Sequence, residues 1–143
     1  MRCFSGGTIE EIIVVGLDTG EDVLESIKRV IAEQEIADGI VVAGIGSLSK
    51  ASYHIVEPGD VKAWKDTHIE KIGTIEIVSI SGVIASGQPH LHISLSQHDQ
   101  AFGGHLEPGS IVLTLAEIII VMLSAKMERV IGQEGFGRIR LAR

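Results

Sequence analysis

The sequence predicts an α+β domain in which one main helix packs on a twisted, mostly antiparallel sheet of six to seven strands. The apolar residues follow a helical spacing in one stretch, residues 23–31. From residue 40 onward, β-branched apolar runs alternate with polar or glycine-containing turns. The length of 143 residues suits a single domain over residues 1–143, with enough chain to bury a core. Aromatic residues are only 3% of the chain, so Ile, Val, Leu and Ala must build that core.

The elements are expected in a simple order, one strand, the helix, and then strands to the end. A cap at Asp18 or Thr19 is expected to start the helix, and Gly39 is expected to follow its last turn. Residues 62–71 are polar and predict a surface excursion. The apolar set changes parity within residues 72–86, which predicts a bulge or two covered faces. The expected strands cover residues 8–17, 40–48, 51–56, 72–86, 91–97, 110–124 and 138–142.

The charge balance argues against nucleic acid as a direct ligand. Twelve Lys and Arg residues against nineteen Asp and Glu residues give a net charge of −7. No dense basic cluster interrupts this acidity, and phosphate backbones are held mainly by such clusters. We therefore expect no direct binding of DNA or RNA by this chain alone.

Cysteine usage and hydropathy predict a cytoplasmic protein with no membrane association. Cys3 is the only cysteine, which excludes an internal disulfide and suits a reducing compartment. Glu10 and Glu11 interrupt the region where a secretory leader needs an apolar stretch. The longest apolar run, residues 111–123, is too short to span a bilayer and contains Glu117.

Three histidines form the strongest chemical motif of the chain. His90 and His92 are two residues apart in an expected strand, so their side chains share one face. His105 directly follows the pair Gly103 and Gly104, which allows a tight turn and a close backbone approach. Three His ligands and no Cys are typical of a zinc site with an open position for water or substrate. The alternative is that these are surface or hydrogen-bonded histidines.

The chain contains other polar residues that could belong to a site. His54, His68 and His98 are expected to face solvent rather than to bind metal, and Glu76 is expected on a solvated face. Glu117 lies within an apolar run, where burying a carboxylate is costly without a partner. It is expected to avoid solvent, either close to the metal or bound to backbone amides or a lysine at a subunit boundary.

Several segments, taken in order, resemble the PPC domain (plants and prokaryotes conserved) over about residues 8–124. The segments are residues 18–24 (DTGEDVL), 42–48 (VAGIGSL), 75–82 (IEIVSISG), 89–92 (PHLH), 103–106 (GGHL) and 114–117 (TLAE). The resemblance implies an α+β fold, a homotrimer, and a metal site on His90, His92 and His105. It also implies a more distant fold similarity to acetolactate decarboxylase, an enzyme with a three-histidine zinc centre.

Two functions remain open from the sequence. The first is a zinc-binding homotrimer whose three-histidine site takes a small ligand or substrate, with Glu117 as the catalytic carboxylate. If it is an enzyme, the distant similarity points to a metal-dependent lyase or hydrolase acting on a small carbonyl compound. The second is a non-enzymatic assembly module that contacts partner proteins, including DNA-bound regulators. The sequence has no Arg-Gly-Arg-Pro segment of the AT-hook type, which plant members of this family carry.

Overall fold

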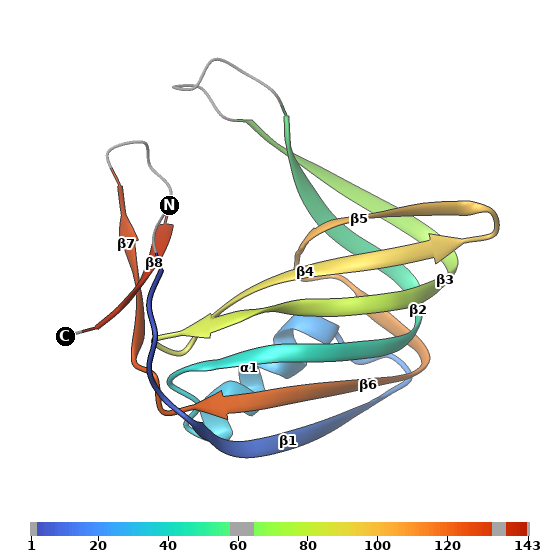
Figure 1. Cartoon of the computed structure of the whole chain (residues 1–143). Helices are drawn as coiled ribbons and strands as arrows, with labels where there is room; N and C mark the ends of the chain where they lie inside the picture. Colours follow the sequence, from blue (N-terminus) through green and yellow to red (C-terminus); the bar gives the residue numbers. More distant parts are fainter. Residues whose placement is uncertain (1–2, 58–64, 133–136, 143) are drawn as a thin grey trace.

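The computed structural model describes residues 3–57, 65–132 and 137–142. These residues contain one helix, α1 (Val23–Glu33), and a series of antiparallel strands (Figure 1). The strands are β1 (Ile9–Asp18), β2 (Gly39–Glu57), β3 (Lys65–Ala85), β4 (Gln88–Gln97), β5 (Gln100–Leu106), β6 (Ile111–Leu123), β7 (Met127–Ile131) and β8 (Gly137–Leu141).

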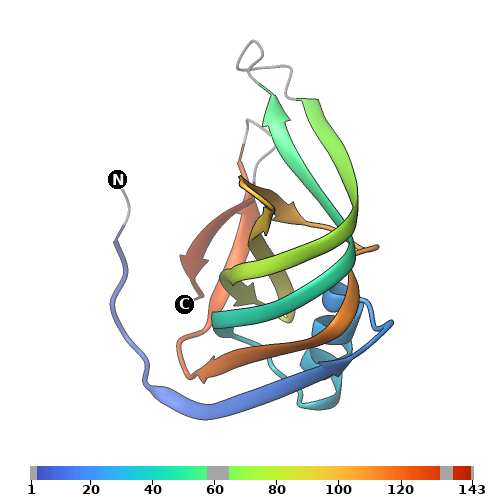
Figure 2. The same ribbon diagram turned by 90° about the vertical axis from the view of Figure 1, so that its right-hand side faces the viewer.

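The main sheet has six strands in the order β1-β6-β2-β3-β4-β5, and every pairing is antiparallel. Helix α1 lies against one face of β1, β6 and β2, and the opposite face of these strands is left open (Figure 2). On β6, Ala116, Ile118 and Ile120 are fully buried, as period-two alternation requires of residues that face the core. The predicted α+β architecture with one helix is therefore confirmed.

Strands β2 and β3 form a long bent hairpin whose far half folds over β5. The far half of β2 pairs with β5 through Tyr53–Leu106 and His54–His105, so strands β2 to β5 close on one another. Residues 40–48 and 51–56, expected as two strands, belong to this single strand. Residues 65–71, expected as a surface excursion, are the paired start of β3, and residues 58–64 lie outside the described residues. The expected bulge occurs between Ile77 and Ser79.

The helix ends differ from the predicted caps. Asp22, rather than Asp18 or Thr19, is the N-cap, and its side chain accepts a hydrogen bond from the amide of Glu25. Asp18 ends β1 instead, because β1 stays paired with β6 up to that residue. The helix stops at Gln34, well before the expected glycine, and Glu35 takes the left-handed conformation with φ of 52°.

Strands β7 and β8 form a separate hairpin that stands beside the main sheet (Figure 1). The strand predicted over residues 138–142 is present as β8, but in the described residues it pairs with β7 and not with the main sheet. The buried carboxylate of Asp38 holds the start of the hairpin, since it accepts the amide hydrogens of Ser86 and Met127. Within the described ranges, no helix is long and apolar enough to cross a membrane.

Candidate metal centre

The two histidines of β4 project from the same face of the strand, as the sequence predicts. Leu91 and Ile93 alternate with them and are buried in the core. The rings of His90 and His92 are nearly parallel, with an interplanar angle of 11° and centroids 5.5 Å apart. The alternation of β4 thus presents two imidazoles side by side outside the core.

The third histidine arrives through the tight β4–β5 hairpin, in which His105 lies directly opposite His92. Its ring centroid is 4.7 Å from that of His90 and 5.5 Å from that of His92. One ring nitrogen from each of the three residues lies within 4.8 Å of the others. A zinc ion binds imidazole nitrogen at about 2.0–2.1 Å, so small side-chain rotations would bring all three onto one ion.

Two glycines allow this approach. A Cβ atom on Gly103 would lie 2.0 Å from the carbonyl oxygen of Ile93, and one on Gly104 would lie 2.4 Å from that of His54. Any side chain at either position would separate β5 from its neighbours. The glycine pair before His105 is therefore a steric requirement of the site.

Two of the three histidines, His90 and His105, are favoured in the neutral form that binds metal. Partial burial, followed by the neighbouring His54 and His90, lowers the pKa of His105 to about 4. Burial also lowers the pKa of His90, and the charge of Arg129 and the neighbouring histidines add to this effect. Neutral imidazole carries the free lone pair that a metal ligand needs.

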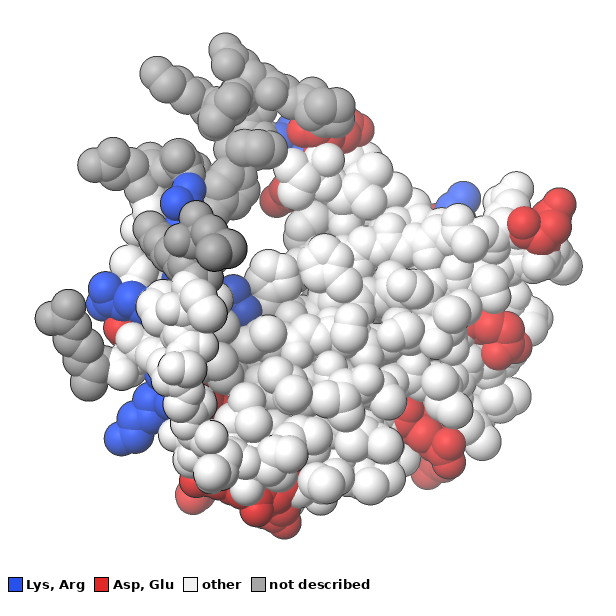
Figure 3. All heavy atoms as spheres, viewed as in Figure 1, with Lys and Arg blue, Asp and Glu red and all other residues white. Residues whose placement is uncertain are grey.

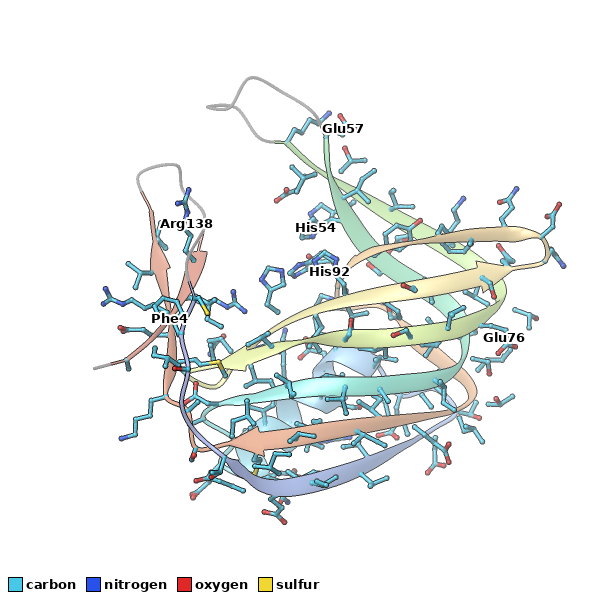
Figure 4. The ribbon with its side chains drawn as sticks, viewed as in Figure 1. Phe4, His54, Glu57, Glu76, His92 and Arg138 are labelled. Atoms are coloured by element: carbon cyan, nitrogen blue, oxygen red, sulfur yellow. The ribbon has the colours of Figure 1, made fainter. Side chains whose placement is uncertain are left out.

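A basic hairpin borders the histidines. His54 and His92 point into the space between the main sheet and β7–β8 (Figure 4). In the space-filling view, Lys and Arg side chains gather around the hairpin, whereas Asp and Glu line the lower and right edges (Figure 3). Arg129 of β7 is half-buried, and burial lowers its pKa. Its charge acts on His90, so the site combines neutral nitrogen ligands with a guanidinium.

The structure also places His54, which was expected to face solvent, beside the three-histidine group. Its side chain is only 16% exposed, and its Nδ1 lies 2.6 Å from Oε1 of Glu107. Its ring stacks on that of His105, with centroids 4.4 Å apart. The solvent-facing prediction for His54 is therefore wrong. His68 is exposed as expected, yet its ring centroid is 5.4 Å from that of His54.

The expectation that Glu117 avoids solvent is wrong for the single chain. Its side chain is exposed on the open face of β6, where it shares a side with Leu115. Strands β2 and β3 separate β6 from β4. Three strand spacings of about 4.8 Å place strand β6, which carries Glu117, about 14 Å across the sheet from strand β4, which carries His90 and His92. Glu117 belongs to neither group of potential metal ligands among the described residues.

Two minor expectations are confirmed. His98 is exposed in the β4–β5 turn, where it has a left-handed φ of 54°. Glu76 is exposed on β3. Neither side chain is close enough to the histidines to take part in the site.

Comparison with solved structures shows the same fold in three proteins of known source. A metal-containing protein of Archaeoglobus fulgidus is 22% identical, with a TM-score of 0.81 over 100% of both chains. A plant- and prokaryote-conserved (PPC) protein of Pyrococcus horikoshii is 26% identical, with a TM-score of 0.80 over 99% of both chains. A protein of Bacteroides thetaiotaomicron that carries DNA binding in its name is 21% identical, with a TM-score of 0.81 over 96% of this chain and 99% of the other.

Sequence comparison gives the family. The bifunctional protein GlmU of Synechococcus sp. (strain JA-2-3B'a(2-13)) is 30% identical over 112 residues, which are 77% of this chain. The matched part is only 16% of the length of that relative, and 15% for a second GlmU from strain JA-3-3Ab. Residues 4–124 match the Plants and Prokaryotes Conserved (PCC) domain, and they include all three predicted metal ligands. With this match over most of its length, the chain belongs to the PCC, or PPC, domain family.

Proposed function

We propose that this protein binds one divalent transition ion, zinc, on His90, His92 and His105 and uses it to hold a small ligand. The observation that carries the proposal is the convergence of three ring nitrogens within 4.8 Å of one another. The lowered pKa values of His90 and His105 and the absence of thiolates from the group suit zinc with an open coordination position. The structurally similar protein of Archaeoglobus fulgidus is described as metal-containing, which supports the same chemistry here.

The surroundings favour a small anionic carbonyl compound as the ligand. A bound zinc ion would polarise a carbonyl oxygen or lower the pKa of a bound water molecule. The guanidinium of Arg129 supplies a fixed positive charge beside His90, which suits a carboxylate group. A metal-dependent lyase or hydrolase reaction fits this set of groups.

The open face of the sheet supports the proposal that the protein is a homotrimer. Large apolar side chains are exposed there on four neighbouring strands, including Val14 at 73% and Val78 at 57%. Monomeric proteins seldom leave such a continuous apolar patch in water. Further members of the patch are Ile12, Ile45 and Leu115.

The alternative function, a non-enzymatic assembly module, is favoured by this same exposed face. A partner protein could cover the apolar patch instead of a second and third copy of the chain. Light scattering on the purified protein separates the two cases, because self-assembly gives a trimer mass without any partner. A monomer at micromolar concentration would favour the assembly module.

Metal analysis tests the proposed site. Protein purified without a histidine tag should contain zinc, and His92→Ala should remove most of the zinc held at the three-histidine site because one of its three ligands is lost. His98→Ala is the matched control, since this histidine is exposed in a turn away from the group. Equal metal loss in both variants would show adventitious binding and overturn the proposal.

A further inference from the structure

Four histidines form a continuous row across four strands. His92 of β4 lies opposite His105 of β5, His105 lies opposite His54 of β2, and His54 lies opposite His68 of β3. Directly opposed residues of antiparallel strands have Cβ atoms about 4.5–5.5 Å apart. The first half of this row belongs to the three-histidine site, which leaves the second half without an assigned role.

The second half of the row contains a complete ligand set. One ligand atom from each of His54, His68 and Glu107 lies within 4.8 Å of the others. Glu107 reaches this position because it directly follows β5, where its amide donates a hydrogen bond to the carbonyl of Ser52. Its Oε1 lies 2.6 Å from His54 Nδ1, so carboxylate and imidazole already face each other.

We propose that His54, His68 and Glu107 bind a second divalent transition ion next to the first. Two imidazoles and one carboxylate are a known ligand set for catalytic zinc and for Fe(II), with further positions open to water or substrate. His68 is exposed, so an ion could reach the group from solvent. His54 is largely buried, so its ring is held in place by its neighbours. The site shares no ligand with the first.

The stacked rings of His54 and His105 place the two ions side by side. Their centroids are 4.4 Å apart, and each ring belongs to a different ligand group. Two divalent ions would carry a charge of about +4, while Glu107 contributes the only carboxylate of the two groups. Such a pair needs an anion between or beside the ions, which agrees with the anionic ligand proposed for the first site.

The experiment is a metal titration of the full-length protein after removal of bound metal with a chelator. Zn²⁺ binding is followed by calorimetry, and Co²⁺ binding by the visible absorption of coordinated cobalt. The wild-type protein should take up about two ions per chain, one for each ligand group. His68→Ala should lose one of them and keep the other. This variant is expected to fold, because the side chain it truncates is exposed.

Two further variants make the outcomes distinct. Glu107→Gln should weaken the second ion by at least tenfold, since it replaces a carboxylate ligand with a neutral amide. His92→Ala should lose only the first ion. If wild type saturates at a single ion, or if His68→Ala binds as much as wild type, the second site does not exist. If His92→Ala keeps the wild-type metal content while His68→Ala loses one ion, the proposed three-histidine site is wrong and the second site is supported.

Discussion

Gly104 offers a sharp test of how β5 is held against β2. A Cβ atom at this position would lie 2.4 Å from the carbonyl oxygen of His54 and 3.0 Å from the Tyr53 ring. Real Cβ contacts essentially never fall below 3.0 Å, so in Gly104→Ala the backbones must separate by about 0.6 Å. The two strands pair at only two positions, Tyr53–Leu106 and His54–His105. The shift therefore changes the contact between His54 and His105, which belong to the two different groups of potential metal ligands.

The magnitude follows from the backbone nature of the clash. Since a carbonyl in a paired strand cannot rotate away as a side chain can, the cost is that of overpacking a core, about 1–3 kcal/mol of the free energy of unfolding. For a chain of this size, that lowers Tm by roughly 3–10 °C. Metal ligands tolerate displacements of only about 0.2 Å, so the site that includes His54 should also lose affinity.

Chemical denaturation of the metal-free protein measures the stability, and zinc titration measures the site. Gly16→Ala is the control, because a Cβ there meets nothing within 4 Å of the chain and Gly16 lies on β1, away from β5. Gly16 pairs with Glu117 on the face that we propose the trimer covers, so both variants are compared at a protein concentration low enough to dissociate the trimer. We expect the control to unfold like wild type. If Gly104→Ala were as stable as Gly16→Ala and bound zinc equally well, the close approach of β5 to β2 would not be what positions the histidines.

Three further outcomes are expected. Burial lowers the pKa of His105 to about 4 in the folded chain, against an ordinary value of 6.5. Between these two pH values, His105 is protonated in the unfolded chain and neutral in the folded chain. Metal-free stability should fall between pH 6.5 and pH 4, by about 1 kcal/mol after allowance for partial exposure, and His105→Gln should flatten this dependence in denaturant titrations. Val14→Glu should dissociate the proposed trimer in light scattering, whereas Ile131→Glu, on the separate hairpin, should not. Duplex DNA should show no binding in about 150 mM salt by fluorescence anisotropy, because each chain carries a net charge of −7.

The sequence predicted those parts of the fold that local patterns determine. The spacing of Val23, Ile27 and Ile31 places them on one helix face, and all three are buried. The helix start was misplaced because several capping residues stand in a row, and only the pairing of β1 with β6 decides among them. Strand β5 was missed because its glycines hide the strand pattern, although they are what lets it pair so closely.

The three-histidine group was predictable because its ligands are near one another in sequence. His90 and His92 show strand alternation, and the next strand brings His105 back after a short turn. His54 and His68 were missed because their approach depends on the bent β2–β3 hairpin and its pairing with β5, neither of which a local pattern reveals. The sequence offered one clue to this pair. His54 and His68 lie in two segments of mixed polar and apolar residues, one before and one after an expected turn at residues 57–60.

The position of Glu117 shows what strand alternation can predict and what it cannot. Alternation gives the side of the strand on which a side chain lies, but not whether that side is buried. The pattern places it on the same side of its strand as Leu115, which is correct, but apolar neighbours did not decide between burial near the metal and a position at a subunit boundary. The apolar face is instead the open one, which we propose is covered in the trimer. Glu117→Gln should therefore leave zinc content and affinity unchanged, because about 14 Å of sheet separates it from the β4 histidines. It should instead alter the trimer's dissociation on dilution, since a carboxylate buried between subunits needs a partner there. If this variant lost zinc while the trimer stayed intact, Glu117 would belong to the metal site. The argument from strand order that keeps Glu117 away from the metal would then be wrong.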